Sequence, residues 1–221
     1  MSQVDWIIIG VLLLLGLILP KRKNTEKKDR TTFIESNGFQ YEELASLAHL
    51  KKLHLWGFKL LLKGDNEEVT KLMFKKDNNL DLFIFEYKYQ GVFDGPTNNS
   101  TITYSYQKAV YFEFVRPQGV SFNLYPEGLI EKTKQSILSN DIDFNDYPVF
   151  SKSYALYGEN EEAIRKLFTK PLLEFLEQNK GFSVEYRKGG MLIHKKGNTP
   201  YSKIELLLND ARFIKDQLCL K

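Results

Sequence analysis

Residues 80–89, LDLFIFEYKY, carry the strongest structural signal in the sequence. Their side chains alternate between two faces with the period of two that is typical of a β-strand. One face holds Phe83, Phe85, Tyr87 and Tyr89, and the other holds Leu80, Leu82 and Ile84. Because both faces are apolar in the first half of this segment, we expect a strand that is buried on both sides.

The next apolar segment, residues 102–116 (ITYSYQKAVYFEFVR), predicts the antiparallel partner of that strand. The intervening residues 91–100, GVFDGPTNNS, contain the Gly, Asp-Gly and Pro that are typical of turns. One face of the return strand is formed by Ile102, Tyr104, Tyr106, Val110, Phe112 and Phe114. Together the two segments predict a long hairpin with one aromatic side.

Shorter apolar segments predict further strands at 58–62, 69–75, 120–124 and 150–157. A second hairpin is predicted by FSVEYRK and MLIHKK, which flank Gly189-Gly190. A two-residue turn at the glycines would set Tyr186 opposite Ile193 and Glu185 opposite His194.

Helices are predicted over residues 41–55 and after Pro126, Asn160 and Pro200. Asn160 is suited to cap a helix, Pro171 must kink or split that helix, and 179–181 (Asn-Lys-Gly) would end it. The last helix has an apolar stripe of Ile204, Leu207, Leu208, Ala211, Ile214 and Leu218. Because the strands run mostly as hairpins, the chain is predicted to be α+β, with helices packed on an antiparallel sheet.

An uncharged apolar run, WIIIGVLLLLGLILP, precedes all of these elements. As a helix it would span roughly 22 Å, somewhat less than the ~30 Å hydrocarbon core of a bilayer. A cleaved signal peptide and a buried core element are alternatives, but no basic residue precedes the run and no A-x-A pattern follows it. We therefore predict an uncleaved single-pass transmembrane helix, with anchor residues Trp6, Ile7, Leu12, Leu15 and Leu19.

Basic residues cluster directly after this run: Lys21, Arg22, Lys23, Lys27, Lys28 and Arg30. Positive charge stays on the cytoplasmic side, so the domain that follows is expected to face the cytosol from the cell membrane. The cluster also predicts a contact with anionic lipid headgroups, although it would equally serve as a topology signal alone.

The chain is thereby divided into an anchor (1–20), a basic juxtamembrane linker (21–36) and a soluble α+β domain (37–221). The domain also allows a division into halves at 37–140 and 141–221. A hydrophobic content of 43% is enough for a packed core. Beyond residue 30 the acidic and basic residues are equal in number, so no nucleic-acid partner is expected.

Motifs of catalysis and of metal or cofactor binding do not emerge from the sequence. His49 and His54 would lie ~140° apart around a helix, too far to share a metal ion. The acidic segment that begins at Asp141 lacks the Gly and Glu of a calcium loop. No nucleophile elbow or phosphate-binding glycine loop occurs, and the single cysteine, Cys219, is expected to pack.

Residues 141–168, DIDFNDYPVFSKSYALYGENEEAIRKLF, together with the Gly-Gly hairpin and the last helix, carry a resemblance. With IFEYKY and VSFNLYPE upstream, they resemble a group of bacterial membrane-associated proteins of unknown function. That resemblance implies an apolar N-terminal segment and a soluble α+β domain over about residues 70–220. It supplies no activity and no site residue.

The leading functional hypothesis is a membrane-anchored binding or interaction module, with a protein or a lipid headgroup as its partner. One alternative is an enzyme on membrane-derived substrates, for which the candidate acid–base groups are His194, Glu185, Asp141 and Asp143. Another is an apolar-ligand-binding domain that would use Phe83, Phe85, Tyr104, Tyr106 and Phe112.

Overall fold

The computed structural model describes residues 24–63, 65–77, 80–94, 100–114, 119–127 and 141–218. Within these ranges no helix is long and apolar enough to cross a bilayer. The predicted anchor, Lys21 to Lys23, Cys219 and the helix predicted after Pro126 lie outside the described residues, apart from the first two positions of that helix.

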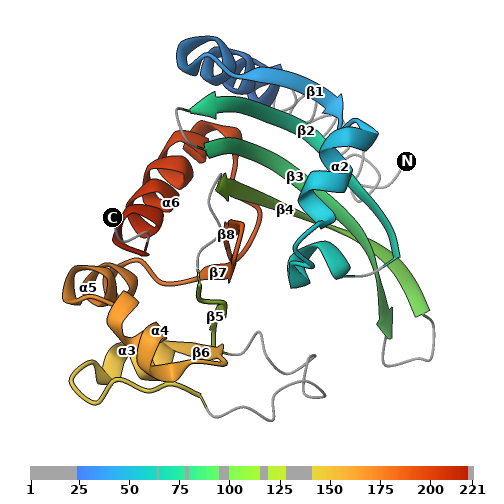
Figure 1. The fold of residues 1–221 in the computed structure, drawn as a ribbon. Coiled ribbons are helices and arrows are strands. Elements are labelled where there is room, and N and C mark those ends of the chain that lie inside the picture. Colours follow the sequence, from blue (N-terminus) through green and yellow to red (C-terminus); the bar gives the residue numbers. More distant parts are fainter. Residues whose placement is uncertain are drawn as a thin grey trace, which may run out of the picture.

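The described strands form one antiparallel eight-stranded sheet in the order β1-β2-β3-β4-β8-β7-β5-β6 (Figure 1). The strands are β1 (Gln40–Leu44), β2 (Asp65–Asp77), β3 (Leu80–Asp94), β4 (Ser100–Phe114), β5 (Phe122–Pro126), β6 (Tyr154–Gly158), β7 (Phe182–Arg187) and β8 (Gly190–Lys195). The helices are α2 (Leu47–His54), α3 (Pro148–Ser153), α4 (Glu161–Leu167), α5 (Lys170–Gln178) and α6 (Ile204–Leu218), with 3-10 helices η1 (Lys59–Leu62) and η3 (Tyr201–Lys203). The predicted α+β class is confirmed.

The long hairpin is the centre of this sheet. β3 and β4 pair from Leu80–Phe114 to Asp94–Ser100, so the predicted partners are confirmed. β2 continues the sheet on one side, and β8 continues it on the other. Strands from both sides of residue 140 therefore belong to one sheet.

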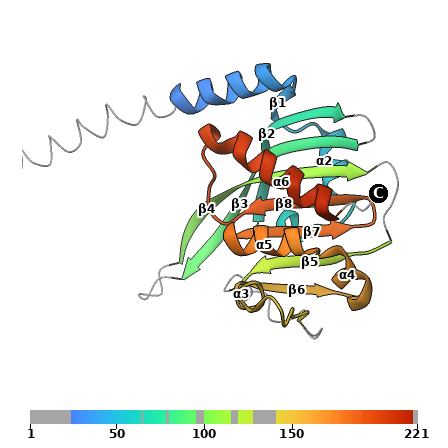
Figure 2. The same ribbon diagram turned by 90° about the vertical axis from the view of Figure 1, so that its left-hand side faces the viewer.

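Helices cover both faces of the sheet and create two hydrophobic clusters. α5 and α6 lie across one face, and α2 lies behind the sheet in the same view (Figure 2). Ile84, Val110 and Ile193 pack in the cluster with α6, whereas Phe83 and Tyr111 pack in the cluster with α2 and η1. The strand at 80–89 is buried on both faces in its first half, as its two apolar faces predict.

Local signals placed the C-terminal helices correctly. Asn160 caps α4, since its side chain accepts a hydrogen bond from the backbone N–H of Ala163 at 3.0 Å. Pro171 lies in the first turn of α5, so the predicted helix is split in two. Gly181, at φ +96°, ends the segment in the left-handed region that glycine tolerates. All members of the predicted apolar stripe of α6 are buried.

Three predicted elements are wrong. The predicted helix 41–55 is divided between β1 and α2, because Tyr41 pairs with Met73 of β2 and Ser46 then caps α2. The segment 58–62, predicted to be a strand, instead forms the 3-10 helix η1 from Lys59 to Leu62. The segment 150–157 begins as α3, whose first turn contains Pro148, and becomes strand only at Tyr154.

The predicted register of the β7–β8 hairpin differs from the observed register by two residues and is also wrong. Tyr186 lies opposite Met191, and Glu185 lies opposite Leu192. A two-residue turn at Gly189-Gly190 of the favoured type needs positive φ at both glycines, and neither has it. Instead each glycine makes room for an aromatic ring: a Cβ on Gly189 would lie 1.9 Å from a ring carbon of Trp56.

Residues 24–37 form a helix in the described structure, and all but the last of them belong to the predicted juxtamembrane linker. Phe33 on this helix is buried and stacks on Phe39, with ring centroids 5.4 Å apart. This helix therefore contributes to the core.

Candidate functional site

Glu185 and His194 are the two candidate acid–base residues that the β7–β8 hairpin brings to one face of the sheet. Glu185 is fully buried, and its carboxylate accepts the backbone N–H groups of Lys59 at 2.5 Å and Leu60 at 2.9 Å. Burial raises the pKa of Glu185, and these two donors oppose the rise. Its hydrogen bonds fasten η1 to the sheet, which is a structural role.

His194 is 4% exposed, and its Nδ1 has no hydrogen-bond partner among the described residues. Burial, with the nearby Lys63 ammonium as a smaller cause, lowers the pKa of His194 to about 3. The imidazole is therefore neutral at physiological pH. No hydrogen bond joins it to Glu185 in the described structure.

The other two acid–base candidates lie elsewhere. Asp141 Oδ1 accepts the backbone N–H of Leu156 at 2.7 Å, beside β6. Asp143 is exposed, and its carbonyl accepts a hydrogen bond from Arg165. The four residues named for an enzyme are not gathered in one site.

The residues named for an apolar-ligand pocket are separated as well. Phe83 and Phe85 lie in the cluster with α2, and Phe112 lies in the cluster on the opposite face. All three are at most 2% exposed, whereas Tyr104 and Tyr106 are 50% and 43% exposed on the outer part of the hairpin. These five side chains therefore cannot line one cavity.

The basic residues of the helix 24–37 differ in their surroundings. Lys27 and Lys28 are exposed. The Arg30 side chain is only 12% exposed; it lies over the ring of Tyr41 and bonds Glu43 at 3.4 Å. Of these three, the two lysines are free to meet an anionic surface.

A buried ion cluster was missed by sequence reasoning. Glu86 on β3 binds Lys108 on β4 at 2.9 Å and Lys71 on β2 at 2.7 Å. Lys108 also donates to Asn198 Oδ1 at 3.0 Å and lies 4.4 Å from the ring centre of Tyr201. The signal was available: Glu86 and Lys108 each interrupt an otherwise apolar face of a strand.

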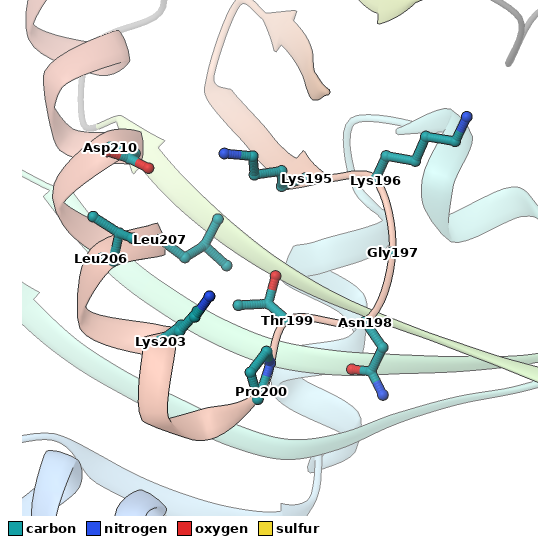
Figure 3. A pocket seen from close by; sticks show the side chains of 10 residues that line it. All are labelled: Lys195, Lys196, Gly197, Asn198, Thr199, Pro200, Lys203, Leu206, Leu207 and Asp210. Carbon is teal, nitrogen blue, oxygen red and sulfur yellow. The ribbon is translucent and has the colours of Figure 1, made fainter. Parts of the chain in front are cut away.

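The loop 195–200, which runs from the last residue of β8 to η3, is basic and borders two hollows. On its α6 side lies a hollow of about 270 Å³, shown in Figure 3. Lys195 and Lys203 reach toward this space, whereas Lys196 points to the other side of the loop. Asp210 of α6 is the acid in this lining, and burial raises its pKa against the effect of Lys195.

A second hollow, of about 260 Å³, lies on the other side of the loop. Lys196 and Gly197 belong to both linings, so the loop separates the two hollows. His194 and Lys63 line the second one. The loop with its two hollows is the candidate functional site, and its chemistry is suited to binding negatively charged groups.

No protein-family model matches this chain, and no curated protein matches it. A solved structure with a similar fold is that of the mycobacterial trehalose monomycolate transport factor A, TtfA. The TM-score is 0.60 at 16% sequence identity, and the alignment covers 88% of this chain and 94% of that chain. At this identity the likeness shows a shared α+β fold.

Proposed function

We propose that the chain is a single-pass, membrane-anchored binding module whose α+β domain faces the cytosol. The apolar run before residue 21 and the basic cluster after it support the anchor and its orientation. The structural neighbour is described as a transport factor, and its fold supports a binding role for this domain.

The observation that carries the binding role is the basic loop 195–200 with hollows on both sides. Lysines line both hollows. Of the four residues named for catalysis, His194 lines one hollow, whereas Glu185 and Asp141 accept backbone N–H groups and Asp143 lies elsewhere. The binding surface that we assign is therefore this loop and the adjoining part of α6.

Membrane attachment is tested by fractionation of cells that express the full-length chain. After carbonate extraction the wild-type chain is expected to remain in the membrane fraction. A variant with Leu12→Arg and Leu15→Arg should be absent from that fraction. Cys219 gives the orientation: a membrane-impermeant maleimide should label it only after lysis. Labelling of intact spheroplasts would contradict a cytosolic domain.

The binding surface is tested by a photoreactive amino acid introduced at Leu206, which is 57% exposed and lines the hollow in Figure 3. Val149 on α3 is 47% exposed and serves as the matched control position. Photocrosslinked adducts with a binding partner are expected when the photoreactive residue is at position 206. They should decrease when the same chain also carries Lys203→Glu. Equal adducts at both positions, or none at Leu206, would contradict this assignment of the surface.

A further inference from the structure

The hollow beside His194 forms where two paired strands part. The ladder between β4 and β8 ends at the Ala109–His194 pair. Beyond it β4 continues toward Ser100 with β3 as its one strand neighbour, while the chain after β8 turns away as the loop 195–200. The space between the edge of β4 and this loop is the hollow of about 260 Å³.

Its walls are fixed before any ligand arrives. Gln107 of β4 donates through Nε2 to the carbonyl of Lys195 at 2.9 Å and to that of Lys108 at 3.0 Å. The Tyr87 hydroxyl donates to Glu67 Oε2 at 2.6 Å and also lies 3.2 Å from the carbonyl oxygen of Lys63, so the chain after η1 lies close to β3. A site with pre-set walls loses less conformational freedom on binding.

The lining carries positive charge and no carboxylate. Among the described residues its lining includes Lys63 and Lys196, together with Tyr89, Ser105 and Tyr106. Among the described residues the Lys63 ammonium has no hydrogen bond and no ion pair. Glu185 acts on its pKa from a distance, but the Glu185 oxygens accept the backbone N–H groups of Lys59 and Leu60, and one lies 3.5 Å from Arg187.

Burial lowers the pKa of Lys63, so the surrounding protein disfavours its charge. An anion in the hollow would reverse this effect. His194 lines the hollow, and its Nδ1, which is itself buried, has no hydrogen-bond partner among the described residues. Buried polar atoms in native proteins nearly always have a partner, so an orphaned one in a basic hollow points to a ligand.

We propose that this hollow binds a phosphate-bearing small group, with Lys63 and Lys196 as its charged contacts and His194 in its wall. A phosphate offers several strong acceptor oxygens, which match two ammonium groups, an imidazole and neighbouring hydroxyls. The group would be either a lipid headgroup or a free organophosphate. This inference rests on the proposed function, because it names the ligand class of a binding module.

The test uses the full-length chain in uncharged detergent micelles with ¹⁵N-labelled histidine. The chain has three histidines, so His49 and His54 on or beside α2 are internal controls. Glycerol 3-phosphate is expected to shift the His194 signals saturably and to leave the other two unchanged. Glycerol, and chloride at matched ionic strength, should have no effect.

A variant of Lys63 and a matched lysine control test whether this hollow binds the phosphate. Lys63→Gln should weaken binding about tenfold or more, the effect of one lost charge-assisted hydrogen bond. Lys170→Gln removes the same charge from an exposed position on α5 that lines neither hollow, and it should leave the affinity unchanged. Circular dichroism verifies that both variants are folded. Equal weakening by both, or no saturable shift of His194 with any phosphate compound, would overturn the proposal.

The source of the phosphate is resolved by a parallel titration with dihexanoyl phosphatidylglycerol. Tighter binding of this lipid than of glycerol 3-phosphate indicates a headgroup site, and equal or weaker binding indicates a soluble organophosphate. Membrane fractionation and the Leu206 adducts do not depend on Lys63. If they hold while His194 stays unshifted by both compounds, the phosphate proposal fails and the proposed function stands.

Discussion

The buried ion cluster gives the sharpest prediction about stability. Glu86 is 4% exposed and Lys108 is 2% exposed, and the Glu86 carboxylate is shared between Lys108 and Lys71. Glu86→Gln keeps the shape of the side chain but leaves two ammonium groups without a counter-charge. Breaking a buried pair from one side costs about 3–5 kcal/mol, so we expect a loss of that size in the free energy of unfolding.

Lys108→Met is the contrasting change. It leaves Glu86 paired with Lys71, which remains partly exposed and accessible to water. We therefore expect Lys108→Met to cost less than Glu86→Gln. The double variant, which combines both changes, leaves Lys71 as the one charged member of the cluster. The loss of stability in the double variant should fall well short of the sum of the two single losses. Equilibrium denaturation of the full-length chain in micelles at pH 7 measures all three.

The same cluster predicts a pH dependence. Burial opposes ionisation of Glu86, but hydrogen bonds from Lys71 and Lys108 outweigh it and hold the pKa of Glu86 below its usual value. The folded state then binds fewer protons than the unfolded state, so this contribution is present above an unfolded pKa of about 4.3 and is lost as pH falls. The stability gap between wild type and Glu86→Gln should shrink below about pH 4. A Glu86→Gln cost under about 1 kcal/mol at pH 7, or a gap that widens in acid, would refute this reasoning.

Three further changes are measured by the same denaturation experiment. Gly189→Ala should destabilise the fold by about 1–3 kcal/mol through its clash with the Trp56 ring, whereas Gly119→Ala, with open space around it, should be near neutral. Asn160→Ala should cost about 1 kcal/mol by removing the cap of α4, and an unchanged midpoint would contradict that role. Leu208→Ala should cost about 2–5 kcal/mol, since Leu208 is a fully buried residue of α6. A smaller loss would mean that the surrounding side chains collapse into the cavity.

The parts of the fold that sequence predicted correctly are those set by neighbours along the chain. The cap at Asn160, the split at Pro171 and the stripe of α6 each depend on a few adjacent residues. The errors arise where pairing with a strand distant in the sequence determines the secondary structure. Residues 41–44 have a helical pattern, but pairing with β2 makes them a strand, and no local signal reports that pairing.

The candidate site was only partly accessible to sequence for the same reason. His194 was named, and the parity of its strand placed it correctly on one face with Glu185. Lys63 was not named, because its approach to His194 depends on η1, which was predicted to be a strand. The hollow forms where the pairing between β8 and β4 ends. The position of that end depends on the register of the two strands, which the sequence does not show.

Lys108 and Lys63 show the difference between a lysine that stabilises the fold and a lysine that is available to bind a ligand. Lys108 is almost fully buried and is matched by Glu86 and Asn198, so its charge is already satisfied within the described protein. Lys63 is partly buried and has no hydrogen bond or ion pair among the described residues. Since both charges cost desolvation but only one recovers it internally, Lys63 is the one whose position is best explained by an external anion.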